Sequence, residues 1–548
     1  MGVIGSDLVA RALKQQGVRD FFFIMGGPML AVESACLAAG LRGIDVRHEQ
    51  AGAMAAHAYA RLLNRPGVCM AASGPGTTNL ITGVAHAWAD RTPVLALGGA
   101  SPDATLGRGV FQEIDQLAMM EPCTKWAARV HDPHRIPELI DRAVREAMGG
   151  QVGPVYLDLP GDVLYQEVDE AAVDWPEPWD PAGRSRPAGD PAQIAAAVGL
   201  LAKAEAPVIL SGSGILWSEA EAALEAFVEA TGIPFYTTPQ SRGVIPEDHA
   251  YCYLTARGAA FREADLILVV GTRLNYVVGH AAPPRFNAGA KLVRVDIDPA
   301  EIAGGGRADI GITGDARAVL GQLTEAAKGR LGPGRFAAWR ERLRGRNDSR
   351  AAENEARLNS AEVPIHPLRL CRELRDFIGR DGVLVVDGQE ILNYGRQSIP
   401  TYTARHRINS GVFGTMGVGL PCGMGAKAAK PEAQVVVLHG DGSFGLNAME
   451  FDTCVRHGLP LLVVLSNNGG WTGDPDGAKP GRDLGYTRYD KLAEALGGYG
   501  EHVTEPDQIR PALERAWAKV EAGVPALVNV ETDPKARATT ADFTRYTT

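Results

Sequence analysis

Short β-rich apolar runs alternate with alanine-rich stretches of helical periodicity along most of this 548-residue chain. In the first third, runs such as DFFFIMGG and GPVYLDLPGD end in glycine turns, and helices are predicted between them over 31–39, 49–63 and 78–88. Strands that alternate with helices form parallel sheets covered by helices on both faces. The sequence therefore predicts an α/β protein with three doubly wound parallel-sheet domains.

Two hydrophilic stretches mark the predicted domain boundaries. Residues 166–188 lack periodicity and are dense in Pro, Asp and Gly, and residues 331–363 carry a long helical charge pattern. Both are typical of linkers. We expect domains at 1–165, 189–330 and 364–535, followed by a tail at 536–548 without apolar periodicity.

Composition excludes several classes of partner. The formal net charge of −10 argues against nucleic acid or an anionic membrane as the main partner. Seven cysteines without a CxxC pair indicate neither a disulfide framework nor a zinc site. The N-terminus lacks the apolar block of a signal peptide, and no run approaches 18 apolar residues. We expect a cytoplasmic protein that does not span a membrane.

Residues 435–471 predict one βαβ unit with a metal and diphosphate site. A buried strand ends at Gly440-Asp441-Gly442, a helix is expected near 447–457, and a second buried strand ends at Asn467-Asn468. A right-handed crossover sets the carboxyl ends of the two strands side by side, so Asp441 and Asn468 converge. Their oxygens suit Mg²⁺ completed by phosphate oxygens, and the carbonyl of Gly470 supplies a third protein ligand. Gly442 and Ser443 then lie beside the diphosphate.

This GDG motif, followed by 24 residues and then NN, resembles the signature of the thiamine diphosphate (ThDP) enzymes. The resemblance covers nearly the whole chain, with a pyrimidine-binding domain, a Rossmann-like middle domain and a diphosphate-binding domain in that order. It is greatest to the group of acetolactate synthase, oxalyl-CoA decarboxylase and 2-hydroxyacyl-CoA lyase. In this family the acid of an HE element activates the cofactor at its aminopyrimidine N1′. Here that acid is Glu49, at the start of a predicted helix rich in small residues.

The resemblance assigns further site residues. The carbonyl of Gly414 should accept from the 4′-amino group, and Met416 should wedge between the two rings. Phe111 and Gln112 should face the reacting centre. Gln389 and Glu390 should lie beside the diphosphate or the substrate, in the loop after a strand that ends at Asp387. Because the family builds each site from two subunits, we expect a homodimer at minimum and a homotetramer as the full assembly.

The resemblance favours a 2-hydroxyacyl-CoA lyase that releases formyl-CoA and an aldehyde or ketone. A base must take the proton of the 2-hydroxyl, and Glu390 and Glu494 are the candidates. The tail after Glu531 resembles a segment that closes over CoA, with Arg537 and Arg545 as phosphate partners. Trp471 departs from the usual family pattern and changes the wall of the substrate pocket, which argues against oxalyl-CoA.

Several alternatives stay open on sequence grounds. Oxalyl-CoA decarboxylase and acetolactate synthase share much of the same pattern, and a nucleotide-binding scaffold with the ThDP fold is the non-enzymatic alternative. In the middle domain, Asp296 or Asp298 is placed to meet a ribose hydroxyl, as in a Rossmann-like unit. No GxGxxG motif is present there, so bound ADP, bound FAD and an empty domain are all compatible with the sequence.

Overall fold

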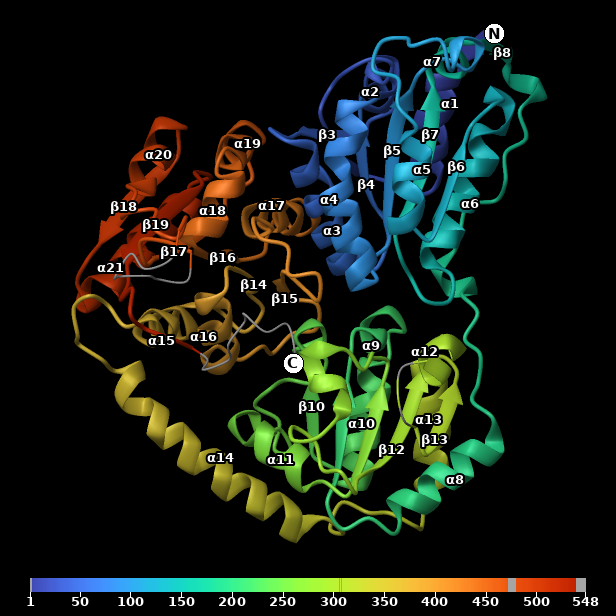
Figure 1. Cartoon of the computed structure of the whole chain (residues 1–548). Coiled ribbons are helices and arrows are strands. Elements are labelled where there is room, and N and C mark those ends of the chain that lie inside the picture. The colour runs from blue at the N-terminus through green and yellow to red at the C-terminus, as the bar shows by residue number, and fades with distance from the viewer. Residues whose placement is uncertain (1, 305, 307, 472–479, 539–548) are drawn as a thin grey trace.

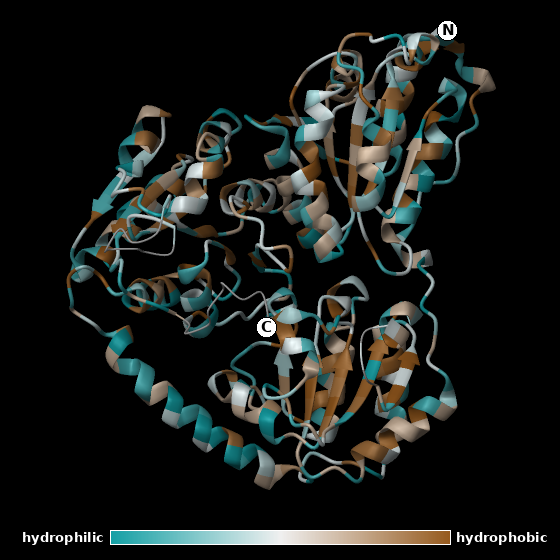
Figure 2. Cartoon of the chain, in the orientation of Figure 1, coloured by the Kyte–Doolittle hydropathy of each residue, from teal (hydrophilic) through white to brown (hydrophobic). Residues whose placement is uncertain are grey.

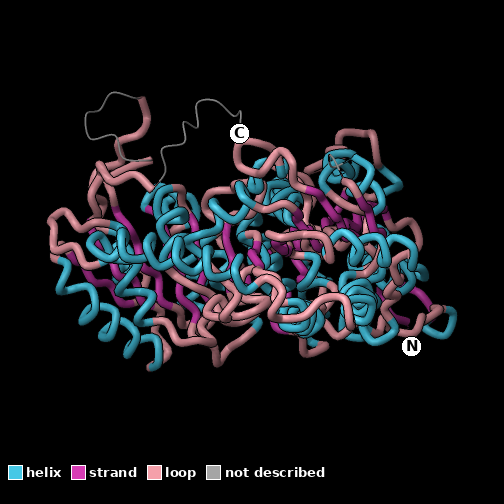
Figure 3. Tube along the Cα trace, turned by 90° about the horizontal axis from the view of Figure 1, so that it is seen from below, coloured by secondary structure: helices cyan, strands magenta, loops and turns pink. Residues whose placement is uncertain are grey.

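The computed structural model describes residues 2–304, 306, 308–471 and 480–538. Its three main sheets are entirely parallel, with strand orders β3-β2-β4-β5-β7-β6, β10-β9-β11-β12-β13 and β15-β14-β16-β17-β19-β18. Helices lie on both sides of each sheet, so the strands form inner layers (Figures 1 and 3). The predicted α/β class with three doubly wound parallel sheets is confirmed.

The N-terminal domain contains the first six-stranded sheet. Its strands are β2 (Asp20–Phe23), β3 (Arg42–Asp45), β4 (Gly67–Ala71), β5 (Val94–Ala100), β6 (Trp126–Arg129) and β7 (Val155–Pro160). Its helices are α1 (Gly5–Gln15), α2 (Leu30–Ala38), α3 (Glu49–Leu63), α4 (Pro75–Asp90), α5 (Gln116–Met120), α6 (Ile136–Met148) and α7 (Gly161–Tyr165). A short antiparallel pair, β1 (Gly2–Ile4) and β8 (Glu167–Asp169), joins the two ends of this domain.

The middle domain has a five-stranded sheet. Its strands are β9 (Pro207–Ser211), β10 (Phe235–Thr237), β11 (Leu266–Val270), β12 (Lys291–Asp296) and β13 (Ile310–Thr313). Its helices are α8 (Pro191–Leu201), α9 (Gly214–Trp217), α10 (Glu221–Thr231), α11 (Arg257–Glu263), α12 (Pro299–Gly304) and α13 (Ala316–Ala327).

The C-terminal domain repeats the six-stranded arrangement. Its strands are β14 (Val383–Asp387), β15 (Arg407–Asn409), β16 (Val435–Gly440), β17 (Leu462–Asn467), β18 (Tyr499–Val503) and β19 (Ala526–Glu531). Its helices are α15 (Pro367–Phe377), α16 (Glu390–Ser398), α17 (Gly419–Ala429), α18 (Asp441–Asn447), α19 (Glu450–Arg456), α20 (Tyr489–Ala495) and α21 (Ile509–Glu521). The expected helix at 447–457 is wrong in its start: helix α18 begins directly at Asp441, and a break at 448–449 separates it from α19.

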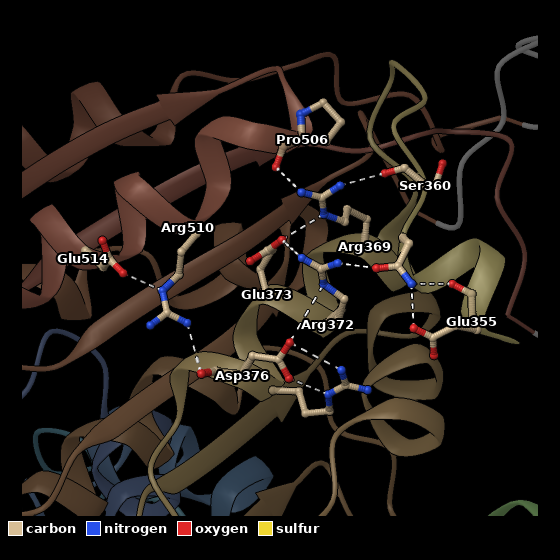
Figure 4. A network of polar contacts seen from close by, with 11 residues as sticks. Glu355, Ser360, Arg369, Arg372, Glu373, Asp376, Pro506, Arg510 and Glu514 are labelled. Carbon is tan, nitrogen blue, oxygen red and sulfur yellow. Dashed lines mark hydrogen bonds and ion pairs between the residues drawn. The ribbon is translucent and has the colours of Figure 1, made fainter. Parts of the chain in front are cut away.

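A long polar helix, α14 (Ala337–Leu358), connects the middle and C-terminal domains and runs along the outside of the molecule (Figures 1 and 2). It accounts for the helical charge pattern seen in this part of the sequence. Just beyond it, Arg369 of α15 donates to the carbonyls of Ser360 and Pro506 at 3.1 and 3.2 Å and to Glu373 at 2.9 Å (Figure 4). These bonds fix the end of the connection to the last domain.

The N-terminal and C-terminal domains share one hydrophobic core through helices α3 and α17. Small residues make this contact close: a Cβ on Gly425 would lie 2.0 Å from the carbonyl oxygen of Ala55. The packing brings the start of α3 and the start of α18 to the same region of the molecule, where Gln50 donates to Asn447 at 3.0 Å.

The cysteines and the longer helices bear on two expectations from the sequence. All seven cysteines are free thiols, as their spacing indicates. Within the described ranges, no helix combines the length and apolar composition needed to cross a membrane.

Candidate active site

Asp441, Asn468 and Gly470 converge at the carboxyl ends of β16 and β17, as the βαβ pattern predicts. The terminal amide atom of Asn468 lies 2.8 Å from the Gly470 carbonyl oxygen and 3.0 Å from Asp441 Oδ1. In the protein alone this atom is the amide nitrogen, which donates to both oxygens. Half a turn of the amide puts its oxygen there instead. Oxygens about 2.9 Å apart are then spaced as neighbouring ligands of an octahedral Mg²⁺ with bonds of about 2.0–2.1 Å.

Asp441 has a second feature that fits a cation. Its side chain is buried, and among the described residues its Oδ2 atom has no hydrogen-bond partner. Burial raises the pKa of this carboxyl to about 7. Because a buried carboxylate oxygen without a partner is costly, the arrangement favours a bound cation beside Oδ2.

The residues that follow Asp441 have different roles. The Ser443 hydroxyl donates to the Gly440 carbonyl at 3.1 Å and lies 2.8 Å from His439 Nδ1, so it points into the protein. Gly442 must be glycine, because a Cβ there would lie 2.9 Å from the ring of Trp471. The Trp471 ring therefore covers the GDG turn, and only the main chain of Ser443 remains to meet a ligand.

Residues 410–417 form the strap that carries the two ring-contacting candidates. Gly414 has a φ of +69°, and its N–H donates to the Ser410 carbonyl at 3.1 Å. Met416 is half-buried two residues later. Asn447 of α18 donates to the Gly417 carbonyl at 2.7 Å and so ties the strap to the GDG helix.

Glu49 is the first residue of α3, where the sequence places it. His48 caps the helix by accepting from the Gln50 N–H at 3.2 Å. The Glu49 carboxylate accepts from Asn79 of α4 at 3.0 Å, and its other oxygen lies 3.5 Å from the position of a Cβ on Gly76. Asn79 therefore orients the carboxylate of Glu49.

Glu450, which sequence reasoning missed, holds the residues immediately before Glu49. It lies on α19 of the C-terminal domain, is 1% exposed, and accepts from the backbone N–H groups of Arg47 and His48 at 3.0 and 3.1 Å. Its Oε2 accepts from the Thr453 hydroxyl at 2.7 Å. Burial raises the pKa of Glu450 to about 7. No local spacing links this acid to residue 49, so only the tertiary contact reveals it.

Gln112 and Phe111 lie on a loop against the start of α4. Gln112 has a φ of +59°, accepts from the Ser73 hydroxyl at 2.8 Å, and its carbonyl would meet a Cβ on Gly74 at 2.5 Å. Phe111 projects from this loop and is 84% exposed. Gln116 holds the start of α4 against the sheet: its side-chain oxygen accepts from the Gly74 N–H, and its side-chain nitrogen donates to Asp158 of β7.

Comparison with known proteins decides the family. Three family models match the chain: "Thiamine pyrophosphate enzyme, N-terminal TPP binding domain" at 4–119, the central domain of the same family at 194–323, and its C-terminal TPP binding domain at 392–530. The chain belongs to the thiamine pyrophosphate enzyme family.

Full-length relatives within this family carry three different names. A 2-hydroxyacyl-CoA lyase from Arabidopsis thaliana is 35% identical over 97% of this chain and 96% of its own length. An acetolactate synthase large subunit from Mycobacterium tuberculosis is 36% identical, over 96% and 95%. An oxalyl-CoA decarboxylase from Escherichia coli is 32% identical, over 99% and 97%. The comparisons confirm a thiamine pyrophosphate (ThDP) enzyme. The three names correspond to three different reactions.

The two carboxylates considered as bases for the 2-hydroxyl differ in position. Glu390 is the first residue of α16, next to Gln389, and accepts from the Ala538 N–H at 2.8 Å. Glu494 is exposed on α20 and pairs with Lys491 at 2.8 Å. The C-terminal segment therefore reaches Glu390, whereas the carboxylate of Glu494 is engaged in a surface ion pair.

The remaining candidates have local partners or lie outside the described residues. Arg537 donates to the carbonyls of Pro534 and Ala536 at 2.9 Å, and Arg545 lies outside the described residues. In the middle domain, Asp296 ends β12 and accepts from the Asp298 N–H at 3.0 Å. Burial raises the pKa of Asp296 to about 6.

The ThDP enzyme also has a cluster of arginines that sequence reasoning missed. Arg257 and Arg285 of the middle domain and Arg396 of α16 converge between two domains. Burial, together with repulsion from neighbouring arginines, lowers the pKa values of Arg257 and Arg396, and burial lowers that of Arg285. The pKa of Arg257 falls to about 9 and that of Arg396 to about 10. In the part of the chain that the structure describes, none of the three forms an ion pair; nearby Arg242 pairs with Glu247.

Proposed function

We propose that this ThDP enzyme is a Mg²⁺-dependent carbon–carbon lyase that cleaves a 2-hydroxyacyl-CoA to formyl-CoA and an aldehyde or ketone. The observation that carries the choice of a CoA thioester over pyruvate is the set of arginines at positions 257, 285 and 396, which form no ion pair within the described residues. Arg257 and Arg396 are half-buried cations without a carboxylate partner among the described residues, and such cations favour an anionic ligand. The phosphates of CoA would supply several negative charges for the three cations, whereas pyruvate carries a single carboxylate.

The C-terminal segment supports the same choice. The Ala538 N–H donates to Glu390 at 2.8 Å and its carbonyl accepts from Gln397 at 3.3 Å, so the segment lies on α16, the helix that also carries Arg396. A segment anchored on α16 in this way can close over an acyl-CoA arm held by the arginines. Glu390 is then the better placed of the two candidate bases, because the same helix carries it.

ThDP, when bound, supplies the nucleophile for the thioester carbonyl and accepts the electrons of the broken carbon–carbon bond. The protein's part is positioning and proton control. Asp441, Asn468 and the Gly470 carbonyl would hold Mg²⁺ and, through it, the diphosphate. Glu49, oriented by Asn79, would hold a proton at the aminopyrimidine N1′.

The strap and the loop opposite it would complete the site. The Gly414 carbonyl would accept from the 4′-amino group, and Met416 would fill the gap between the rings. Gln112 and Phe111 would line the substrate side. Exposed apolar side chains on both sides of the site, Phe111 at 84% and Phe413 at 54%, favour coverage by a second copy of the chain, in line with a homodimer or homotetramer.

Product analysis tests the proposal. The purified protein, supplied with ThDP and Mg²⁺, is offered 2-hydroxyacyl-CoAs of several chain lengths, oxalyl-CoA, and pyruvate, and the products are measured by mass spectrometry. We expect formyl-CoA together with an aldehyde or ketone. Carbon dioxide with formyl-CoA would identify an oxalyl-CoA decarboxylase, and acetolactate would identify an acetolactate synthase; either result as the main activity overturns the proposal.

A further inference from the structure

Two histidines and an aspartate form a buried cluster between helices α3 and α4, away from the Asp441 site. His57 of α3 and His86 and Asp90 of α4 are each no more than 4% exposed. One ligand atom from each of the three lies within 4.8 Å of the others. His57 Nε2 is 3.5 Å from Asp90 Oδ2, and the two imidazole rings are 4.5 Å apart between centroids.

The polar atoms of this cluster lack ordinary partners. Neither ring nitrogen of His57 or of His86 has a hydrogen-bond partner among the described residues. The side-chain oxygen of Gln240, whose amide nitrogen donates to Asp90 at 2.6 Å, is also buried without a partner. Each unsatisfied buried polar group costs roughly 1–3 kcal/mol, so two unpartnered imidazoles and an unpartnered amide oxygen in one buried cluster indicate a missing ligand.

We propose that His57, His86 and Asp90 bind a divalent transition-metal ion of the Zn²⁺ class. Two imidazoles and one carboxylate are donors that such ions prefer, and one carboxylate with two neutral rings leaves a moderate net charge. Zinc–ligand bonds of about 2.0–2.1 Å place ligand atoms roughly 3.3 Å apart, which requires shifts of about 1 Å or less per side chain from the present separations. The oxygen of Gln240 supplies a fourth ligand once its amide turns.

The protonation of the cluster fits metal binding. Burial, together with repulsion from His57, lowers the pKa of His86 to about 3, so its ring is neutral and keeps a free lone pair near neutral pH. Arg61, a buried cation near Asp90, donates to the Gln240 carbonyl and not to the Asp90 carboxylate.

Such an ion would connect the N-terminal and middle domains directly and would lie next to the strap of the C-terminal domain. Asp90 belongs to the N-terminal domain and Gln240 to the middle domain, and Asp90 Oδ1 accepts from the Val412 N–H of the strap at 3.1 Å. His57 also lies about two helical turns after Glu49 on α3. The metal would therefore stiffen both the helix that carries Glu49 and the strap that carries Gly414.

Metal analysis of the intact protein tests this inference independently of catalysis. Chelator-treated protein is loaded with Zn²⁺, freed of loosely bound ions, and measured by plasma mass spectrometry. We expect one tightly held zinc ion per chain, lost in His57→Gln and in His86→Gln. His131→Gln, which changes an exposed histidine paired with Asp103, should retain it, and so should Asp441→Ala, which removes the proposed magnesium ligand.

Zinc retention in both cluster variants at the level of the unchanged protein would overturn the proposal. If either variant fails to fold, as judged by circular dichroism, Co²⁺ titration of the unchanged apoprotein gives the answer instead. We expect the visible absorption of a four-coordinate cobalt site, and its absence would overturn the inference.

Discussion

The carboxylate of Glu450 accepts a hydrogen bond from the backbone N–H of His48 at 3.1 Å across 402 residues of sequence. The next residue is Glu49, so an acid of the C-terminal domain fixes the start of the helix that carries the proposed cofactor-activating acid. The Arg47 N–H also donates to this carboxylate, so two consecutive backbone N–H groups are bound by Glu450. The two domains are thus coupled through one buried side chain as well as through the α3–α17 core.

Glu450→Gln should weaken this coupling. The amide has one acceptor oxygen where the carboxylate has two, so a buried bond to Arg47, His48 or Thr453 is lost at a cost of roughly 1–3 kcal/mol. We expect a rise of about tenfold in the ThDP concentration needed for half-maximal activity, with little change in far-ultraviolet circular dichroism. Unchanged cofactor affinity would show that Glu450 does not position Glu49.

The same substitution should change how stability depends on pH. Because burial raises the folded-state pKa of Glu450 from its ordinary value of 4.5 to about 7, its contribution to stability is full below pH 4.5 and is lost as pH rises through 7. The shift corresponds to roughly 3 kcal/mol. Urea unfolding at several pH values should therefore show the free energy of unfolding of the unchanged protein falling relative to Glu450→Gln across that window.

Glu49→Gln should abolish turnover and leave the fold intact. A neutral amide cannot hold a proton at N1′ in the way a carboxyl does, so activity should fall by at least about 100-fold. Asn79→Ala removes only the 3.0 Å bond that orients Glu49 and should cost about tenfold. Steady-state kinetics with saturating ThDP measures both. A nucleotide-binding scaffold would show no turnover to lose, and equal effects of the two variants would contradict the positioning role of Asn79.

Asp441→Ala should lower the affinity for Mg²⁺ and, with it, for ThDP. Ser443→Ala, two residues away in the same turn, should not lower either affinity, because the Ser443 hydroxyl already faces His439 and the Gly440 carbonyl. The Trp471 ring packs on Gly442 and gives a fluorescence signal next to the site. We expect ThDP and Mg²⁺ to quench this fluorescence in Ser443→Ala and to leave it nearly unchanged in Asp441→Ala, and equal responses would argue against the metal assignment.

Arg396→Gln should weaken binding of the acyl-CoA substrate. Removing one cation from the unpaired cluster should raise KM by about tenfold with a smaller effect on kcat, since the residue contacts the carrier and not the reacting carbon. The matched control is Arg380→Gln, an exposed arginine that already pairs with Asp248 at 2.6 Å. If KM for the CoA substrate moves equally in both variants, the cluster is not the phosphate site.

The sequence was most informative where function depends on the ends of regular elements. Asp441 and Asn468 could be paired in advance because parallel strands that are neighbours in sequence end at the same edge of a sheet. Glu49 could be placed because it begins a helix with a clear pattern of small residues. The start of α18 was misjudged, since glycines at 440 and 442 favour a turn in isolation but here open a helix.

Glu450, the arginine cluster and the His57–His86 pair could not be predicted in this way. Their partners come from elements separated by long stretches of chain, and no periodicity or spacing records such contacts. Arg257 and Arg396 belong to different domains, and each taken alone reads as an ordinary surface arginine. Their shared location, in which no carboxylate of the described residues pairs with them, is what suggests an anion site.

Gly425→Ala should disrupt the contact between the first and last domains. The added Cβ would lie 2.0 Å from the Ala55 carbonyl oxygen, and because that atom belongs to the backbone of α3, a helix must shift to make room. We expect a loss of about 2–3 kcal/mol in the free energy of unfolding and weaker ThDP binding, because α3 carries Glu49. Gly199→Ala in α8 is the matched control: nothing lies within 4 Å of its Cβ position, so the protein should gain up to about 1 kcal/mol. Thermal and urea unfolding of both variants measures the two changes in stability. Similar stabilities would show that the α3–α17 contact can accommodate an added methyl group.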